Sequence, residues 1–187
     1  PYYNKPSQEG LYRHYKAVAE AVDIPQVLYN IPGRTGVNML PATVARLAVM
    51  KNIVGIKEGS GSVQQASDVA QACGDRLTVL SGDDPLTLPM MAVGAKGVIT
   101  VTANVMPKEM AQLVASFLAG RVDEARRIHF ALSPLFAALF YETNPIPVKA
   151  ALVMIGKIDP ELRLPLCAMG ADNRNQLARV MKEMQLI

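Results

Sequence analysis

The feature of this sequence that most constrains its fold is a regular alternation of short apolar runs with segments of helical pattern. Four runs are rich in β-branched and other apolar residues: 25–30, 53–57, 77–81 and 97–101. Most of them are continuously apolar, which is typical of strands that are buried on both faces of a parallel sheet. Their centres lie roughly 20 to 28 residues apart, which leaves room for a helix between successive strands. We therefore predict an α/β fold with four parallel strands.

The segments between these runs carry helical signals. Residues 8–22 have an apolar stripe with a period of 3.6 residues, and Ser7 before them is a suitable N-cap. The first group of predicted helices is 8–22, 41–49, 62–73 and 85–93. After the last run only helical patterns follow, at 108–119, 122–139, 147–155 and 171–184. A boundary near Gly120 therefore separates an α/β part from a helical part.

Four parallel strands fit either an open doubly wound sheet or half of a (β/α)8 barrel, since a complete barrel needs about 250 residues. An open sheet that binds nucleotides has a glycine-rich phosphate turn after an early strand. The nearest candidate is the turn Gly59-Ser60-Gly61-Ser62, which fits the start of a helix better. The strand pattern alone leaves both topologies open.

Composition excludes several classes of protein. Half of the 187 residues are hydrophobic and 19% are charged, which argues against disorder. The net charge of +3 is scattered, and no basic run interleaves with aromatic residues, so we expect no nucleic-acid partner. No apolar run approaches the ~18 residues of a membrane span. His14, His129, Cys73 and Cys167 lack the spacing of metal ligands, and two cysteines fit a reducing cytoplasm.

The chain begins with Pro1 rather than with Met, and no signal or transit peptide pattern follows. We expect either a processed chain or a piece of a longer protein.

Lys57 is the residue that suggests chemistry most directly. It ends an apolar run, where a charged ammonium group is costly to desolvate. A desolvated lysine loses its proton more readily, and the neutral amine attacks carbonyl groups to form Schiff bases. The alternative interpretation is a lysine at a strand end that reaches solvent or pairs with Glu58.

Tyr29 ends the run before Lys57, and Arg34 follows it on the next loop. In a barrel, residues at the carboxyl ends of strands face the active-site opening. A phenol beside an imine-forming lysine relays protons, and a guanidinium group binds a substrate carboxylate. Taken alone, Tyr29 is more typical of a tyrosine in the core, and Arg34 is more typical of an arginine on the surface. Together the three residues form a hypothesis: a nucleophile, a proton relay and an anion clamp.

Six segments of the chain resemble the dihydrodipicolinate synthase family, in family order along the whole length. They are PYYNKPSQEGLY (1–12), LYNIPGRTG (28–36), GIKEGSG (55–61), LSGDD (80–84), GVITVTAN (97–104) and NPIPVK (144–149). The resemblance implies a (β/α)8 TIM barrel followed by an α-helical C-terminal domain. It also implies that the chain starts after the fourth strand, so that 1–120 form the second half of the barrel and 121–187 form the helical domain.

The resemblance also implies three catalytic residues. Lys57 matches the lysine that forms the Schiff base with pyruvate, and Tyr29 matches the tyrosine that relays protons to and from it. Tyr3 matches a tyrosine that crosses a dimer interface and completes the relay in the neighbouring site.

Four further positions match residues that bind ligands in the family. Arg34 matches the arginine that holds the carboxylate of aspartate semialdehyde. The backbone around Gly82 and Ile99 lines the pocket. Tyr2 matches a position at the dimer-interface site where some members bind lysine as a feedback inhibitor.

The activity that this resemblance implies is the condensation of pyruvate with L-aspartate 4-semialdehyde to 4-hydroxy-tetrahydrodipicolinate, a lyase reaction of lysine and diaminopimelate biosynthesis. It requires no metal or organic cofactor, because the imine on Lys57 is itself the electron sink. The family implies a cytoplasmic homotetramer, built as a dimer of dimers, with small-molecule substrates and no membrane partner.

Other functions stay open. N-acetylneuraminate lyase and the 2-keto-3-deoxy sugar acid aldolases share the lysine and the tyrosine, but the neuraminate enzyme typically lacks an arginine at the position of Arg34. A different class is a non-catalytic half-barrel fragment, whose unpaired sheet edges favour association. Two departures from the family pattern concern the site. Gly59-Ser60 replaces a more usual Ala with Thr or Ser, and the threonine-rich motif of the proton relay has no counterpart here.

Overall fold

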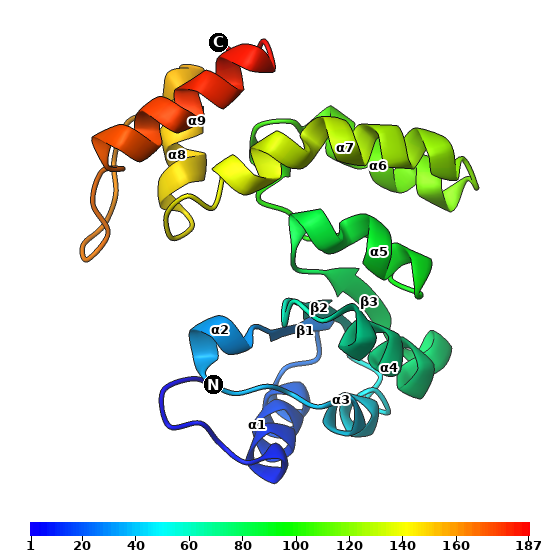
Figure 1. Cartoon of the computed structure of the whole chain (residues 1–187). Helices are drawn as coiled ribbons and strands as arrows, with labels where there is room; N and C mark the ends of the chain where they lie inside the picture. Colours follow the sequence, from blue (N-terminus) through cyan, green and yellow to red (C-terminus); the bar gives the residue numbers. More distant parts are fainter. The chain divides into compact units, whose positions relative to one another are not determined.

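The sheet of the protein has three parallel strands, β1 (Gln26–Asn30), β2 (Ile53–Glu58) and β3 (Thr78–Ser81). β2 lies between β1 and β3. A computed structural model describes all 187 residues of the chain (Figure 1). Three of the predicted strands are confirmed, because each begins and ends within one residue of its predicted bounds.

The fourth predicted strand, residues 97–101, is wrong. Val98 forms only a single bridge with Ser81, flanked by two backbone hydrogen bonds of 2.8 and 2.9 Å. The pairing stops because Val101 adopts a helical conformation, after which Thr102–Asn104 form the 3-10 helix η3. The α/β fold with parallel strands is thus confirmed with three strands instead of four.

Helices connect the strands in the first half of the chain. They are α1 (Gln8–Ala21), α2 (Pro32–Thr35), α3 (Pro41–Leu47), α4 (Val63–Cys73) and α5 (Thr87–Ala92), with 3-10 turns η1 (Gly74–Arg76) and η2 (Asp84–Leu86). Ser7 and Ser62 cap α1 and α4, because each hydroxyl accepts a hydrogen bond from the backbone N–H three residues later (3.2 and 3.1 Å). α3 packs against both α1 and α4 (Figure 1).

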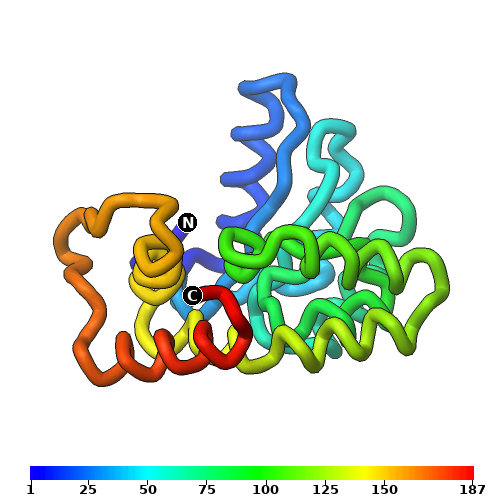
Figure 2. Tube along the Cα trace, turned by 90° about the horizontal axis from the view of Figure 1, so that it is seen from above, coloured from blue at the N-terminus to red at the C-terminus, as the bar shows by residue number.

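The second half of the chain is helical. It contains α6 (Pro107–Leu118), α7 (Val122–Ala138), α8 (Ile146–Met154) and α9 (Ala171–Glu183). α6 and α7 lie antiparallel beside each other (Figure 2), and Gly120 in the turn between them has a φ of +77°, which glycine adopts without strain. No helix of the chain combines the length and the apolar character needed to cross a membrane.

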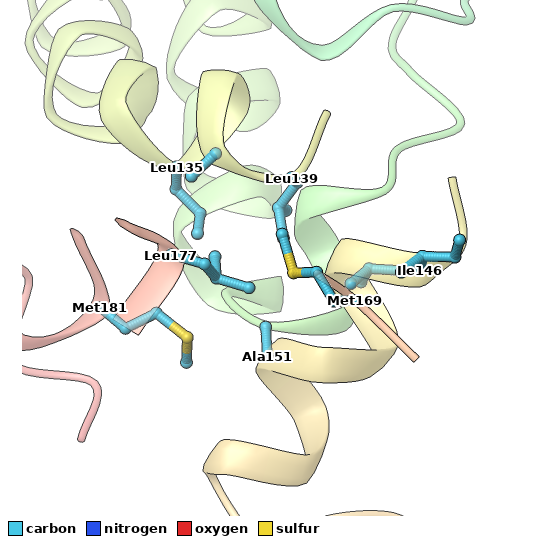
Figure 3. Close-up of a cluster of buried hydrophobic side chains, with 9 residues drawn as sticks. Leu135, Leu139, Ile146, Ala151, Met169, Leu177 and Met181 are labelled. Atoms are coloured by element: carbon cyan, nitrogen blue, oxygen red, sulfur yellow. The ribbon is translucent and has the colours of Figure 1, made fainter. Parts of the chain in front are cut away.

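The helical half has its own apolar core. Side chains from α7, α8 and α9 meet in this cluster with Met169 from the preceding loop (Figure 3). The labelled members are Leu135, Leu139, Ile146, Ala151, Met169, Leu177 and Met181. Burial of these side chains stabilises the packing of the three helices.

The chain divides into two compact units, Pro1–Ile99 and Thr100–Ile187. This division differs from the predicted boundary near Gly120, which lies in the turn between α6 and α7. Within the second unit α6 packs along α7. The boundary near Gly120, which divides the chain by its sequence pattern, stays a prediction.

Candidate active site

Lys57 and Tyr29 lie side by side at the carboxyl ends of neighbouring strands. The register of β1 and β2 pairs Tyr29 with Lys57, and Nζ of Lys57 lies 4.1 Å from the centre of the Tyr29 ring. At this distance an ammonium group and the face of an aromatic ring attract each other. The structure therefore brings together the predicted nucleophile and the predicted proton relay.

The two faces of β1 and β2 differ in burial. Leu28 and Ile56 are buried, whereas Tyr29 is 40% exposed and Lys57 is partly exposed. The prediction that these strands are buried on both faces is not met in this chain: burial alternates along β1 from Val27 to Asn30, and Val54 and Lys57 of β2 are not buried, although Gly55 and Ile56 both are. The face that carries Tyr29 and Lys57 is therefore the more open one. Glu58 lies on the covered face and forms no ion pair with Lys57, so the pairing alternative for Lys57 is wrong too.

Two glycines allow a close approach of the backbone to the site. A Cβ atom on Gly82 would lie 3.1 Å from Cγ of Lys57 and 3.0 Å from the carbonyl oxygen of Glu58. The N–H of Gly82 donates a hydrogen bond to that oxygen (2.7 Å). A Cβ atom on Gly59 would lie 3.3 Å from Cε2 of Tyr29. Gly82, which the resemblance placed in the pocket lining, thus lies against the side chain of Lys57.

Arg34 and Ile99 lie beyond the ends of strands at the same edge of the sheet. Arg34 belongs to α2, a short helix that follows β1 and that the sequence pattern did not predict; its side chain is exposed. Ile99 is 43% exposed, and its N–H donates to the carbonyl oxygen of Ser81 at the end of β3 (2.9 Å). Both side chains are thus exposed.

Tyr3 and Tyr2 lie in the segment before α1 and are 87% and 73% exposed. Tyr3 has a φ of +69°, a left-handed conformation that non-glycine residues rarely adopt. The structure of one chain does not bring either tyrosine together with Lys57. The predicted roles of both residues at an interface with a second chain stay predictions.

Comparison with known proteins assigns the chain to a family. A model of the dihydrodipicolinate synthetase family matches residues 1–184. The chain belongs to this family. The resemblance drawn from the six segments is thereby confirmed.

Individual members of the family are closely similar to the chain. It is 63% identical, over all of its 187 residues and 64% of the relative, to the 4-hydroxy-tetrahydrodipicolinate synthase of Geotalea daltonii. The crystal structure of dihydrodipicolinate synthase from Aquifex aeolicus is 51% identical with a TM-score of 0.98, and the match covers 100% of this chain and 64% of that one. Dihydrodipicolinate synthase from Acinetobacter baumannii, crystallised with pyruvate, is 45% identical with a TM-score of 0.97 and the same coverage. The chain thus spans 64% of the length of these relatives.

The sequence did not reveal the structural role of Glu58, which lies at the same edge of the sheet. It is fully buried, and its carboxylate accepts hydrogen bonds from the Asn30 amide (3.1 and 3.2 Å), the Ser60 backbone N–H (2.7 Å) and the Gln65 amide (3.0 Å). The alternation along β2 was the available signal, because it places Glu58 on the face opposite to Lys57.

The turn Gly59-Ser60-Gly61-Ser62 is the start of a helix and not a phosphate cradle. The N–H groups of Gly59, Ser60 and Ser62 all donate to acceptors within the chain, at 2.8, 2.7 and 3.3 Å, and Ser62 caps α4. These three N–H groups are therefore already occupied by acceptors of the chain and are not available to a bound phosphate.

Acidic groups gather at the end of β3. Burial raises the pKa of Asp83 above its usual value, and the neighbouring charge of Asp84 raises it further. No group of three or more His, Cys, Asp or Glu side chains in the chain lies close enough together to hold a metal ion.

Proposed function

We propose that the protein condenses pyruvate with L-aspartate 4-semialdehyde to 4-hydroxy-tetrahydrodipicolinate through a Schiff base on Lys57. The observation that carries this proposal is the contact of the Lys57 amine with the Tyr29 ring on paired positions of β1 and β2. Membership of the dihydrodipicolinate synthetase family supports it, and so do relatives that are named for this synthase activity.

The chemistry at Lys57 follows from an amine beside a phenol. The neutral amine adds to the ketone carbon of pyruvate, and the resulting carbinolamine loses water to give an imine. Loss of a methyl proton gives an enamine, whose carbon attacks the aldehyde carbon of the second substrate. The amino group of that substrate then displaces the Lys57 amine, which closes the ring and frees the enzyme.

Tyr29 is the proposed acid and base in these steps, because its side chain lies beside the amine and a phenol hydroxyl can donate and accept a proton. Its hydroxyl donates the proton that the departing water needs and takes one back when the enamine forms. In this scheme the imine withdraws the electrons, so the proposal requires no metal or organic cofactor. Tyr3 of a neighbouring chain is proposed to complete the relay.

The remaining predicted residues bind substrates or an effector in this proposal. Arg34, exposed on α2, holds the carboxylate of aspartate semialdehyde as a charge-assisted pair. Gly82 lies against the Lys57 side chain, so its backbone lines the pyruvate pocket together with Ile99. Tyr2 is proposed to contribute to a lysine-binding site between two chains.

We also propose the finer architecture and setting that the family suggests. Residues 1–120 form half of a (β/α)8 barrel, residues 121–187 form a helical domain, and the protein assembles as a homotetramer. The parallel order of β1, β2 and β3 supports the first of these proposals. Cys73 and Cys167 are both free thiols, which supports a cytoplasmic setting.

The proposal is tested by borohydride trapping with pyruvate, followed by peptide mass mapping. Two proteins are compared: the 187-residue chain and a chimera in which the uncovered part of the Geotalea daltonii relative is joined to it. Lys57→Arg is the test variant, and Lys51→Arg, at an exposed turn position before β2, is the matched control. We expect a reduced pyruvate adduct on Lys57 that Lys57→Arg abolishes and Lys51→Arg leaves intact.

An adduct on Lys57 in either protein supports the proposal. If only the chimera is labelled, the 187-residue chain lacks part of the site but the assignment of Lys57 stands. A folded chimera without an adduct, or with the adduct on another lysine, overturns the proposal. Pyruvate consumption with aspartate semialdehyde against a neutral sugar aldehyde then separates the synthase from the sugar acid aldolases.

A further inference from the structure

The covered face of β1 and β2 carries a buried polar network centred on Glu58. Burial of a charged group is costly unless hydrogen bonds satisfy it. Here four hydrogen bonds from N–H groups of uncharged residues reach the two carboxylate oxygens, at 2.7 to 3.2 Å. Glu58 has an exposed fraction of 0%, so water does not supply these contacts.

One backbone group fixes the orientation of the whole network. The N–H of Met39 can only donate, and it donates to Oδ1 of Asn30 (2.9 Å), so Nδ2 of Asn30 faces Glu58 and Oδ1 of Asn38. Nδ2 of Asn38 then donates to Oε1 of Gln65 (2.7 Å), which turns Nε2 of Gln65 toward Glu58 (3.0 Å). Every neighbour therefore presents a donor to position 58. A carboxylate offers two acceptors there, whereas an amide would set one donor against these donors.

This network lies directly behind the proposed reacting pair. Asn30 and Glu58 are the residues after Tyr29 and Lys57, and the register pairs them with each other in the same way. The open face thus carries the Tyr29–Lys57 contact, and the covered face carries the Asn30–Glu58 hydrogen bonds one residue further along. Fixing the second pair fixes the two strand ends that carry the first pair.

We propose that Glu58 is a positioning residue, which holds the ends of β1 and β2 so that the Lys57 amine and the Tyr29 phenol stay in contact. The inference rests on the proposed function of Lys57. Gln65 extends the anchor to the first turn of α4, and Ser60 extends it to the turn that follows β2. Glu58 lies on the face opposite to the Lys57 amine and makes no hydrogen bond to it; it acts through the backbone of its own strand and through Asn30.

The test measures trapping of pyruvate on Lys57 as a time course, in whichever protein the trapping experiment labels. The final amount of adduct reports the fraction of molecules with an intact site, and the rate constant reports how well each site is arranged. For Glu58→Gln we expect a rate constant at least about tenfold lower at saturating pyruvate, because a misplacement of about 1 Å costs up to about a hundredfold. Gln65→Leu, which removes one of the four hydrogen bonds, is expected to lower the rate less. Gln64→Leu on the exposed side of α4 is the control and keeps the parent rate.

The outcomes separate positioning from a merely structural role. A Glu58→Gln protein that gives less adduct at the parent rate constant has lost folded molecules only, and that result overturns the inference. If Glu58→Gln does not fold by circular dichroism, Gln65→Leu decides: a slower rate constant supports positioning, and the parent rate overturns it. Absence of an adduct on Lys57 in the folded chimera as well as in the 187-residue chain instead overturns the proposed function, on which this inference rests.

Discussion

Gly82→Ala tests whether the close approach of the β3 end to Lys57 shapes the site. The new Cβ atom would lie 3.0 Å from the Glu58 carbonyl oxygen and from Cα of Gly59, and 3.1 Å from Cγ of Lys57. Ordinary contacts of a Cβ atom begin at 3.4 Å, so the chain must move by 0.4 Å against two backbone atoms that do not move independently.

The cost of such overpacking is about 1–3 kcal/mol of unfolding free energy. For a chain of this size each kcal/mol lowers the melting temperature by about 2–4 °C, so the expected decrease is about 2–12 °C. Cγ of Lys57 is one of the atoms that the new methyl group would contact, so the methyl group would displace the side chain that carries the amine. We therefore also expect pyruvate trapping to slow by up to about tenfold.

The assay combines thermal unfolding by circular dichroism with the trapping time course. Gly33→Ala is the matched control, because no atom lies within 4 Å of a Cβ atom at that position; its effect on stability is expected to stay within about 0.5 kcal/mol. If the Gly82→Ala protein has the melting temperature and the trapping rate of the parent, the close approach at Gly82 affects neither the stability of the protein nor the geometry of the site.

Three further changes test other parts of the structure. Arg34→Ala should lower kcat/KM for aspartate semialdehyde by about tenfold to a hundredfold, while trapping of pyruvate is unchanged. If the variant keeps the parent kcat/KM for aspartate semialdehyde, Arg34 does not bind its carboxylate. Leu177→Ala, in the fully buried core of the helical unit, should cost about 2–5 kcal/mol in denaturant unfolding, whereas Leu118→Ala at a 59% exposed position should cost little. Burial lowers the pKa of His129 below 6.5, so the unfolded state binds the proton more tightly and the unfolding free energy falls as the pH drops below 6.5. His129→Gln should reduce this loss, and identical pH dependence in parent and variant would contradict it.

Local signals in the sequence were sufficient for most of the elements. Ser7 predicted the start of α1, because a hydroxyl before an apolar stripe satisfies free N–H groups wherever the helix packs. The cap of α4 by Ser62 was not predicted, although the predicted helix 62–73 begins at that residue. The short helix α2 was missed, because four residues cannot display a helical period. The run at 97–101 is β-rich, yet only Val98 pairs, because the chain turns into η3 immediately afterwards.

The sequence predicted the residues of the candidate site, but not the hydrogen bonds that hold the ends of its two strands. Lys57 and Tyr29 both end apolar runs, and parallel strands bring such ends to one edge of a sheet. Glu58 follows Lys57 directly, so a charge pair between them was the obvious sequence interpretation. Alternation across the strand instead puts the two side chains on opposite faces. Two of the three partners of Glu58, Asn30 and Gln65, lie 28 and 7 residues away, and only the fold shows that they meet.

The register of β1 on β2 decides which residues face each other, and an irregularity sets that register. Gln26 pairs with Ile53, but Val27 pairs with Gly55, so Val54 has no partner on β1. Without this extra residue Tyr29 would lie opposite Ile56, and Lys57 would lie opposite Asn30. A shift by one residue also exchanges the faces of a strand, so Lys57 would turn toward the covered side. The irregularity at Val54 therefore sets both contacts at once: Lys57 with Tyr29 on the open face, and Glu58 with Asn30 behind them.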